Sequence, residues 1–288
     1  MTVRYKLGCE LTYEVNAPTV FIFNIEVARL IRHHDISENL VITPALKPRH
    51  HTVPFLNNRY FGIDAPLGPL RVCYEAEVSL DVFRADPNTI GETPLAELPL
   101  DIMPFLLPSR FVPSDRLAAF AIREFGNMPK GHNRVTAICN WLYDHIDYRR
   151  GSSNEQTTAT ESLILRAGVC RDFSHLGIAF CRALNIPARF VSCYAHGLQP
   201  SDFHAVFEAY LDGRWWLFDA TRQANLDGLV RIGVGRDAAE IAFASPYGNY
   251  TPGLVNITIE KADGTPEPVA RTTDAISTEE PAPNAGSN

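Results

Sequence analysis

Three residues in the second half of the chain have side chains suited to nucleophilic catalysis: Cys170, His204 and Asp219. Cys170 begins a stretch up to Leu184 in which apolar residues recur at helical spacing, and Pro187 follows soon after its end. A thiol in the first turn of a helix lies at the positive end of the helix dipole, which favours the nucleophilic thiolate. Because an isolated cysteine is more often a small buried apolar side chain, this position alone does not establish catalysis.

His204 and Asp219 lie in two β-prone runs on either side of the dipeptide Asp212-Gly213. This arrangement is a strong signal for a β-hairpin with a two-residue turn. With that turn, Asp219 lies opposite Val206, one diagonal step from His204 and on the same face of the sheet. Diagonal neighbours are roughly 7–8 Å apart, so an imidazole and a carboxylate can meet. A cysteine, a histidine and an aspartate so arranged supply a nucleophile, a base and a group that orients the base.

Other assignments remain open for these residues. Asp202 lies two residues before His204 on the same strand face and is the alternative orienting acid. His175 would have to point away from the apolar stripe of its helix to act as a base, so we expect a structural role. Cys170, His204 and Asp219 could instead bind zinc, but a thiol at a helix start needs no metal for activation. We therefore expect no metal or other cofactor.

Two segments around these residues resemble a known family. GVCRDFSHLGIAFCRALNIPARFVSCYA, residues 168–195, and DFHAVFEAYLDGRWWLFDAT, residues 202–221, are similar to the transglutaminase-like superfamily of thiol enzymes. More narrowly, they resemble its bacterial transglutaminase-like branch, which is also described as a branch of cysteine proteases. The resemblance covers roughly residues 106–260. It implies that Cys170, His204 and Asp219 are catalytic, and that the cysteine helix packs on an antiparallel sheet in a papain-like α+β core.

The resemblance also bears on the oxyanion hole, the donors that hold the negatively charged oxygen during acyl transfer. The backbone N–H of Cys170 is available as one donor because a helix N-terminus leaves it unpaired. In the family, the segment before the cysteine helix supplies a second, side-chain donor. Gln156 is the best amide donor in the polar loop 148–160, although it could equally be a solvated loop residue.

The activity implied is acyl transfer at an amide or peptide bond through an acyl-thioester on Cys170. Water as acceptor makes the protein a cysteine peptidase or amidase, and an amine makes it a transglutaminase. We favour hydrolysis, because after Tyr148 the loop 148–160 contains no aromatic residue that could exclude water. The alternative from another class is a non-catalytic peptide-binding scaffold, against which the intact triad argues. The expected partner is a peptide or amide-containing substrate.

The chain divides into three regions by composition. Residues 1–105 are rich in β-branched and aromatic runs, which predict a β-sandwich or open barrel, with a hairpin formed by residues 59–63 and 70–80. Residues 106–261 form the expected transglutaminase-like core, so the fold class is α+β. A proline-rich stretch, residues 94–113, predicts an extended linker. Residues 262–288 have few large apolar side chains and are expected to be a disordered tail.

The net charge and the cysteine spacing indicate which binding partners and which cellular compartment to expect. The formal net charge is −7 and the pI is about 5.7, which argues against a general nucleic-acid-binding or anionic-membrane surface. Polar residues interrupt every apolar run near the N-terminus, so we expect no signal peptide. The six cysteines show no CxxC pair and no disulfide-framework spacing, which is typical of a reducing compartment. We therefore expect a cytoplasmic protein, and the sequence predicts no oligomeric state.

Overall fold

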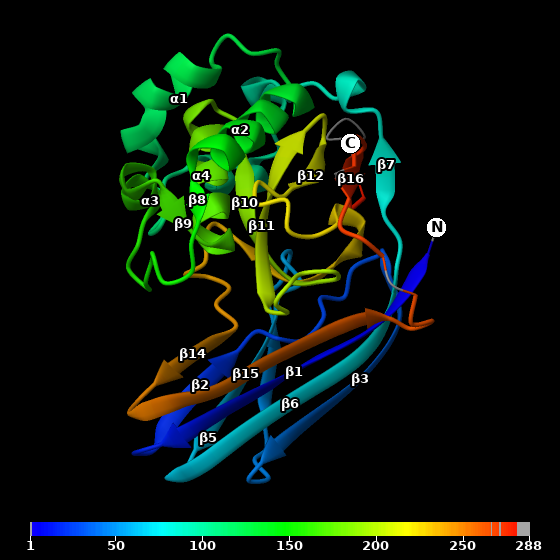
Figure 1. Cartoon of the computed structure of the whole chain (residues 1–288), viewed down its shortest axis with the longest axis vertical. Helices are drawn as coiled ribbons and strands as arrows, with labels where there is room; N and C mark the ends of the chain where they lie inside the picture. The colour runs from blue at the N-terminus through cyan, green and yellow to red at the C-terminus, as the bar shows by residue number, and fades with distance from the viewer. Residues whose placement is uncertain (1, 266, 271, 281–288) are drawn as a thin grey trace.

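The two largest hydrophobic cores of the described residues lie inside a β-sandwich and between helices and a sheet (Figure 1). The computed structural model describes residues 2–265, 267–270 and 272–280. The sandwich lies below the helical half in the view of Figure 1. None of the helices in these described ranges combines the length and the apolar character that crossing a bilayer would require.

The N-terminal sandwich contains two antiparallel four-stranded sheets. The order in the first sheet is β15 (Tyr250–Lys261), β1 (Val3–Val15), β6 (Gly68–Leu80) and β3 (His33–Thr43). The order in the second is β14 (Ala244–Tyr247), β2 (Thr19–Phe23), β5 (Arg59–Ala65) and β4 (Arg49–Thr52). Alternate residues of β6, such as Val72 and Val78, are buried between the sheets, as the period-two pattern predicts. The prediction of a β-rich N-terminal region is thus confirmed, and the described sheets form a sandwich that does not close into a barrel.

The sandwich includes two strands that follow the helical half in the chain. β15 pairs with β1 along most of its length, and β14 pairs with β2. We expected residues 106–261 to belong to the core, but β14 and β15 lie in the sandwich. Pairing with β15 satisfies the backbone N–H and C=O groups that β1 would otherwise expose at a sheet edge. The expected hairpin between residues 59–63 and 70–80 does not form, because β5 and β6 lie in different sheets.

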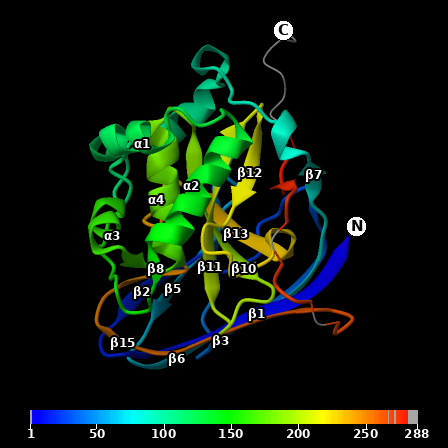
Figure 2. The same ribbon diagram turned by 45° about the horizontal axis from the view of Figure 1, so that its top comes forward.

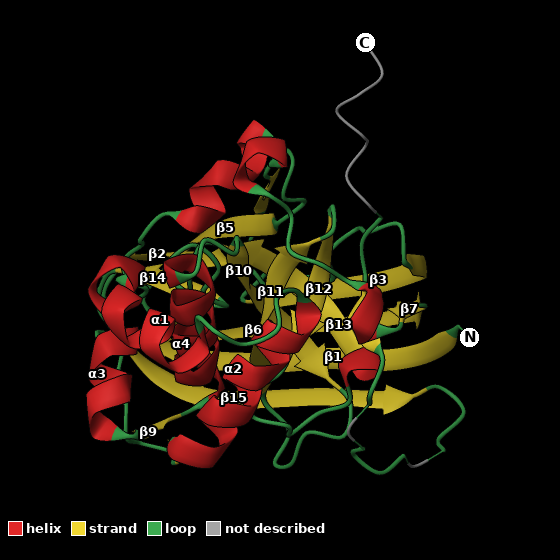
Figure 3. Cartoon of the chain, turned by 90° about the horizontal axis from the view of Figure 1, so that it is seen from above, coloured by secondary structure: helices red, strands yellow, loops and turns green. Residues whose placement is uncertain are grey.

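The core is a four-stranded antiparallel sheet covered on one face by helices. The sheet order is β12 (Arg214–Phe218), β11 (Phe203–Leu211), β10 (Ala188–Ala195) and β13 (Leu229–Gly235). The helices are α1 (Ala118–Phe125), α2 (His132–His145), α3 (Ala159–Leu165) and α4 (Cys170–Ala183). Figures 2 and 3 show these four helices grouped on one side of the molecule. This is the α+β arrangement, with the cysteine helix packed on an antiparallel sheet, that the resemblance implied.

Helix α4 lies directly on the sheet at one glycine. A Cβ atom added at Gly177 would come within 2.5 Å of the Phe207 ring on β11, so only glycine allows this approach. Phe173, Leu176 and Phe180 line the buried side of the helix, as the periodicity predicts. The close packing fixes the start of α4, and with it Cys170, relative to β11.

Shorter elements connect the larger ones. The remaining strands are β7 (Phe83–Ala85), β8 (Asp147–Tyr148), β9 (Ala167–Gly168) and β16 (Ala275–Ser277). The 3₁₀ helices are η1 (Pro87–Thr89), η2 (Leu95–Glu97), η3 (Leu100–Leu106), η4 (Ser114–Leu117) and η5 (Leu226–Gly228). The stretch expected as an extended linker therefore contains η2 and η3. It packs on the core through Phe105, whose ring centroid lies 5.2 Å from that of Trp215.

The C-terminal region also differs from the expected disordered tail. β16 pairs with β7, and Ala275, Ile276 and Ser277 are completely buried. Glu279 follows and forms ion pairs with two arginines of the core sheet, Arg189 and Arg231. Burial and buried charge pairs hold this segment in place despite its polar composition. Residues 266, 271 and 281–288 of the predicted tail lie outside the described residues.

Candidate active site

The first turn of α4 is fixed by a buried carboxylate. Asp172 accepts a hydrogen bond from the backbone N–H of Val169 at 2.9 Å, which caps the helix start. The same carboxylate accepts from the Ser153 hydroxyl and pairs with Arg171 at 3.1 Å, so it also ties the preceding loop to the helix. Cys170 lies half-buried at this N-terminus, where the helix dipole favours a thiolate.

His204 and Asp219 are positioned by the β11–β12 hairpin. The predicted register is confirmed: Leu211 pairs with Arg214, on either side of a two-residue turn. The turn residues Asp212 and Gly213 have φ angles of 48° and 73°, which is typical of a type I′ hairpin turn. His204 lies at the start of β11, and Asp219 follows the end of β12.

The imidazole and the carboxylate make a buried hydrogen bond. His204 Nε2 lies 2.9 Å from Asp219 Oδ2, and the two side chains are 0% and 3% exposed. The other carboxylate oxygen, Oδ1, accepts from the Thr221 backbone N–H at 2.8 Å and from its hydroxyl at 2.6 Å. Asp219 is therefore held in one orientation and in turn holds the imidazole ring.

The pKa values of His204 and Asp219 shift in opposite directions. Burial lowers the pKa of His204, but the charge of Asp219, its hydrogen bond and the nearby Cys170 thiol outweigh burial and raise that pKa to about 10. Burial raises the pKa of Asp219, but the charge and hydrogen bond of His204 and the Thr221 donors outweigh it and lower that pKa. The favoured state at neutral pH is an imidazolium beside a carboxylate.

The second imidazole nitrogen is available to the thiol. With Nε2 bound to Asp219, His204 Nδ1 has no hydrogen-bond partner among the described residues. The Cys170 thiol is nevertheless close enough to contribute to the pKa of His204. The structure thus brings Cys170, His204 and Asp219 together. In the described ranges, no group of three or more His, Cys, Asp or Glu side chains is arranged to hold a metal ion.

The alternative acids and bases lie elsewhere. The Asp202 carboxylate accepts from the Phe203 backbone N–H at 2.8 Å and lies 3.9 Å from the Arg150 guanidinium. Among the described residues, Asp202 makes no hydrogen bond to His204. His175 is completely buried, and its Nε2 accepts from the backbone N–H of Ala238 at 3.2 Å. Asp219 is therefore the carboxylate in contact with His204.

Tyr148 is a residue at the site that the sequence did not single out as functional. The short parallel pair of β8 and β9 sets Tyr148 beside Gly168, two residues before Cys170. Burial raises the pKa of Tyr148, the neighbouring Cys170 thiol raises it further, and the backbone N–H of Cys170 lowers it in part. The ring is 5.9 Å from that of Phe173. Its only sequence signal was its place as the aromatic residue that begins the polar loop.

Gln156, the predicted side-chain oxyanion donor, is placed away from the thiol. It is exposed, and its backbone N–H donates to Asn154 Oδ1 at 2.8 Å. Thr158 caps α3, and the described contacts of the Gln156 backbone are local to this loop. Gln156 does not line the cavity of about 310 Å³ at Cys170, which is lined by Tyr148, Arg150, Gly151, Ser153, Val169, Cys170, Arg171 and Asp202.

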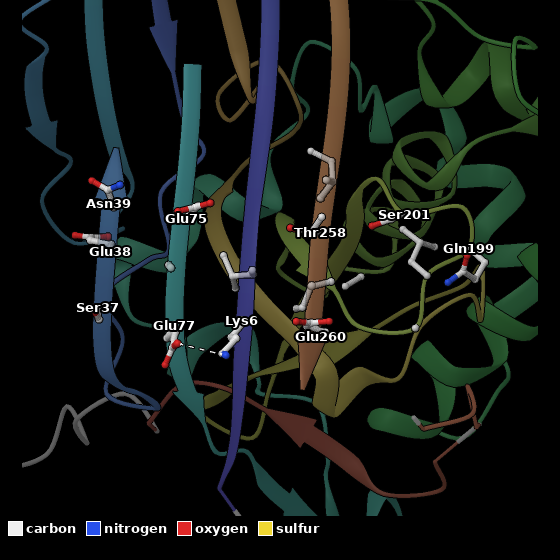
Figure 4. Close-up of a pocket in the computed structure, with 17 residues that line it drawn as sticks. Lys6, Ser37, Glu38, Asn39, Glu75, Glu77, Gln199, Ser201, Thr258 and Glu260 are labelled. Atoms are coloured by element: carbon white, nitrogen blue, oxygen red, sulfur yellow. Dashed lines mark ion pairs between the residues drawn. The ribbon is translucent and has the colours of Figure 1, made fainter. Parts of the chain in front are cut away.

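A larger groove of about 720 Å³ lies along the sandwich sheet and the loop after β10 (Figure 4). Glu75, Glu77 and Glu260 line it, and Lys6 forms an ion pair with Glu77 at 3.9 Å. Gln199 lines the groove from the loop. None of the described lining residues is a cysteine or a histidine, so the groove has no thiol or imidazole like those of Cys170 and His204.

Both halves of the chain match known families. Residues 3–101 match the bacterial transglutaminase N-terminal domain, and residues 119–220 match the transglutaminase-like superfamily. A solved structure from Cytophaga hutchinsonii, described as a "putative cysteine protease", is 38% identical with a TM-score of 0.92. The alignment covers 97% of this chain and 98% of that one. The chain belongs to the transglutaminase-like superfamily.

The curated relatives match a shorter part of this chain than the Cytophaga hutchinsonii structure does. An uncharacterised protein of Mycobacterium leprae is 27% identical over 146 residues, which are 48% of this chain and 52% of the relative. An uncharacterised protein of Mycobacterium tuberculosis is 32% identical over 119 residues, which are 36% of this chain and 38% of the relative. The chain therefore spans about half the length of these relatives or less.

Proposed function

We propose that this protein is a cysteine peptidase or amidase in which Cys170 is the nucleophile, His204 the acid and base, and Asp219 the group that orients His204. One observation carries the proposal. Because His204 Nε2 is bound to Asp219, its Nδ1 is left for the thiol at the start of α4. A nucleophile, a base and an orienting acid in this relation are the requirement for thiol catalysis.

In the first half-reaction the Cys170 thiolate attacks the amide carbonyl carbon, and a C–S bond forms. The carbonyl oxygen becomes an oxyanion, which the backbone N–H of Cys170 stabilises. The proton on His204 Nδ1 passes to the amide nitrogen, and the C–N bond breaks. The products are a free amine, an acyl-thioester on Cys170 and a neutral imidazole.

In the second half-reaction water is the acceptor. Neutral His204 takes a proton from the water molecule, whose oxygen adds to the thioester carbonyl. The C–S bond breaks, the carboxylic acid leaves, and the thiolate and imidazolium are restored. Asp219 stabilises the imidazolium and keeps Nδ1 directed at the thiol in both half-reactions.

Tyr148 is the side chain best suited to assist the Cys170 N–H. Tyr148 lines the cavity at Cys170, and the Cys170 thiol and backbone N–H both shift the pKa of its hydroxyl, which places the hydroxyl near the start of α4. A phenolic O–H can donate to a developing oxyanion. We therefore assign the second oxyanion donor to Tyr148 in place of Gln156.

The walls of the cavity favour water over an amine as acceptor. Arg150, Ser153 and Asp202 are polar, and Tyr148 contributes the one aromatic ring among the described lining residues. Transfer to an amine requires an apolar channel that keeps water from the thioester. A polar wall does not exclude water in this way.

The test is the reactivity of the thiols at pH 6. Burial raises the pKa of Cys9 to about 11, raises that of Cys73, and raises those of Cys181 and Cys193 well above the usual range. Cys170 should therefore react first with iodoacetamide. Peptide mapping identifies the labelled residue, and a substrate-library screen of the wild type beside Cys170→Ala tests turnover. Faster labelling of another cysteine in the folded protein would refute the proposal.

A further inference from the structure

Three charged side chains line the cavity at Cys170, and two of them are arginines. Its charged lining side chains are Arg150, Arg171 and Asp202. Arg171 is committed to the fold, because it donates to the backbone oxygen of Asn154 at 2.6 Å and pairs with the buried Asp172 at 3.1 Å. Arg150 is thus the lining cation that a substrate could engage without breaking the helix start.

Arg150 is loosely paired. Its closest guanidinium nitrogen lies 3.9 Å from an Asp202 carboxylate oxygen, and the two side chains are 57% and 51% exposed. Asp202 is held at its other oxygen by the Phe203 N–H at 2.8 Å. An exposed ion pair of this length contributes little stability, so exchanging Asp202 for a substrate carboxylate costs little. A guanidinium can also bind a carboxylate with two parallel hydrogen bonds.

The loop that carries Asp202 separates the acidic groove from the cavity at Cys170. Gln199 and Ser201 of this loop line the larger groove with Glu75 and Glu260, as Figure 4 shows. Asp202 lines the cavity at Cys170. An anionic group would be repelled by the groove and attracted by Arg150, so its favourable place is beside the thiol.

We propose that Arg150 selects acyl donors that carry a carboxylate next to the scissile carbonyl, such as an acidic peptide or an amide of an acidic amino acid. This proposal rests on the proposed function, since it takes Cys170 as the nucleophile. The cavity of about 310 Å³ is at the lower end of the sizes typical of ligand sites, which fits one such side chain.

Two alkylating reagents test the charge preference without a known substrate. Iodoacetate and iodoacetamide react alike: the thiolate forms a C–S bond, the C–I bond breaks and iodide leaves. They differ in charge, because only iodoacetate carries a carboxylate. The measurement is the ratio of their rate constants at Cys170, each divided by the rate constant with free N-acetylcysteine.

In the wild type the ratio of the iodoacetate to the iodoacetamide rate constant should exceed one. Arg150→Gln should lower this ratio about fivefold, the size expected for one partly solvated charge. Arg150→Lys should retain most of the preference. Asp202→Asn should raise the ratio about twofold or more, because Arg150 then has no competing partner. The matched control is Arg149→Gln, since Arg149 is exposed, pairs with Asp147 at 3.1 Å and does not line the cavity.

Equal ratios for Arg150→Gln, Arg149→Gln and the wild type would overturn the proposal, as would a rise in Arg150→Gln. Circular dichroism and the iodoacetamide rate alone show whether each variant keeps its fold and its reactive thiol. The ratio requires no amide cleavage. A charge preference at Cys170 in a protein that cleaves no amide would refute the proposed hydrolase activity and support the anion site.

Discussion

Changing Glu279 to glutamine should destabilise the protein strongly, although Glu279 lies near the end of the described chain. Its carboxylate binds Arg189 on β10 at 2.6 Å and Arg231 on β13. Glu208 on β11 pairs with the same two arginines. The substitution leaves two buried guanidinium groups with a single carboxylate. Removing one partner from a buried charge cluster is far more costly than losing a surface ion pair.

The pKa of Glu279 gives the size of the effect. Burial raises this pKa, but Arg189 and Arg231 outweigh burial and lower it from the ordinary 4.5 to about 2. At about 1.4 kcal/mol for each pH unit, the carboxylate stabilises the folded state by about 3 kcal/mol at neutral pH. Because the folded pKa is depressed, this stabilisation is present above pH 4.5 and is lost as the pH falls toward 2.

Urea unfolding at several pH values measures this effect. At pH 7, Glu279→Gln should lower the free energy of unfolding by about 3 kcal/mol, and its gap to the wild type should narrow below pH 4.5. The matched control is Glu280→Gln, because Glu280 is 49% exposed and pairs with Arg32 at 2.8 Å. Its loss should stay below about 1 kcal/mol. A Glu279→Gln loss as small as the control's, or a gap independent of pH, would refute the reasoning.

Three further predictions concern the core. Asp219→Asn should keep the fold and lower kcat by roughly 10²–10⁴-fold, and Asp202→Asn should lower it much less; the reverse order in steady-state kinetics would reject Asp219 as the orienting acid. Gly177→Ala should lower the free energy of unfolding in urea by roughly 1–3 kcal/mol, because the new methyl group meets Phe207; unchanged stability would contradict this packing. Millimolar labelled primary amine should divert little of the acyl product in mass spectrometry, whereas mostly amine adduct would favour a transglutaminase.

Local signals were enough to predict the elements that carry the proposed triad. Apolar residues at helical spacing predicted α4, and Asp212-Gly213 predicted a turn that fixed the hairpin register. Since side chains alternate strictly along strands, the register also placed Asp219 and His204 on one face. Their hydrogen bond then follows from local geometry.

Tyr148 could not be predicted in the same way. It reaches Cys170 through a two-residue parallel pairing between β8 and β9, and such a short contact leaves no periodicity in the sequence. Gln156 was chosen for its amide group, but its side chain is exposed and does not line the cavity at Cys170. Both outcomes depend on tertiary contacts that residue type does not encode.

Composition also misjudged the proline-rich stretch and the C-terminal region. Proline removes backbone donors, but 3₁₀ turns tolerate it, and Ile102 and Phe105 bury their side chains from η3. In the C-terminal region, three buried residues of β16 and the ion pairs of Glu279 are sufficient to order a polar segment. An average over many residues conceals such short anchoring groups.

The return of β15 to the N-terminal sandwich has a consequence for synthesis of the protein on the ribosome. Leu254 donates its backbone N–H to Thr12 at 2.7 Å, although the two residues are 242 positions apart. At a translation rate of roughly 5–20 residues per second, β1 is exposed for about 10–50 s before its partner emerges. During this interval the nascent sandwich has an open strand edge, so binding by ribosome-associated chaperones should matter more for this chain than for one with sequential domains.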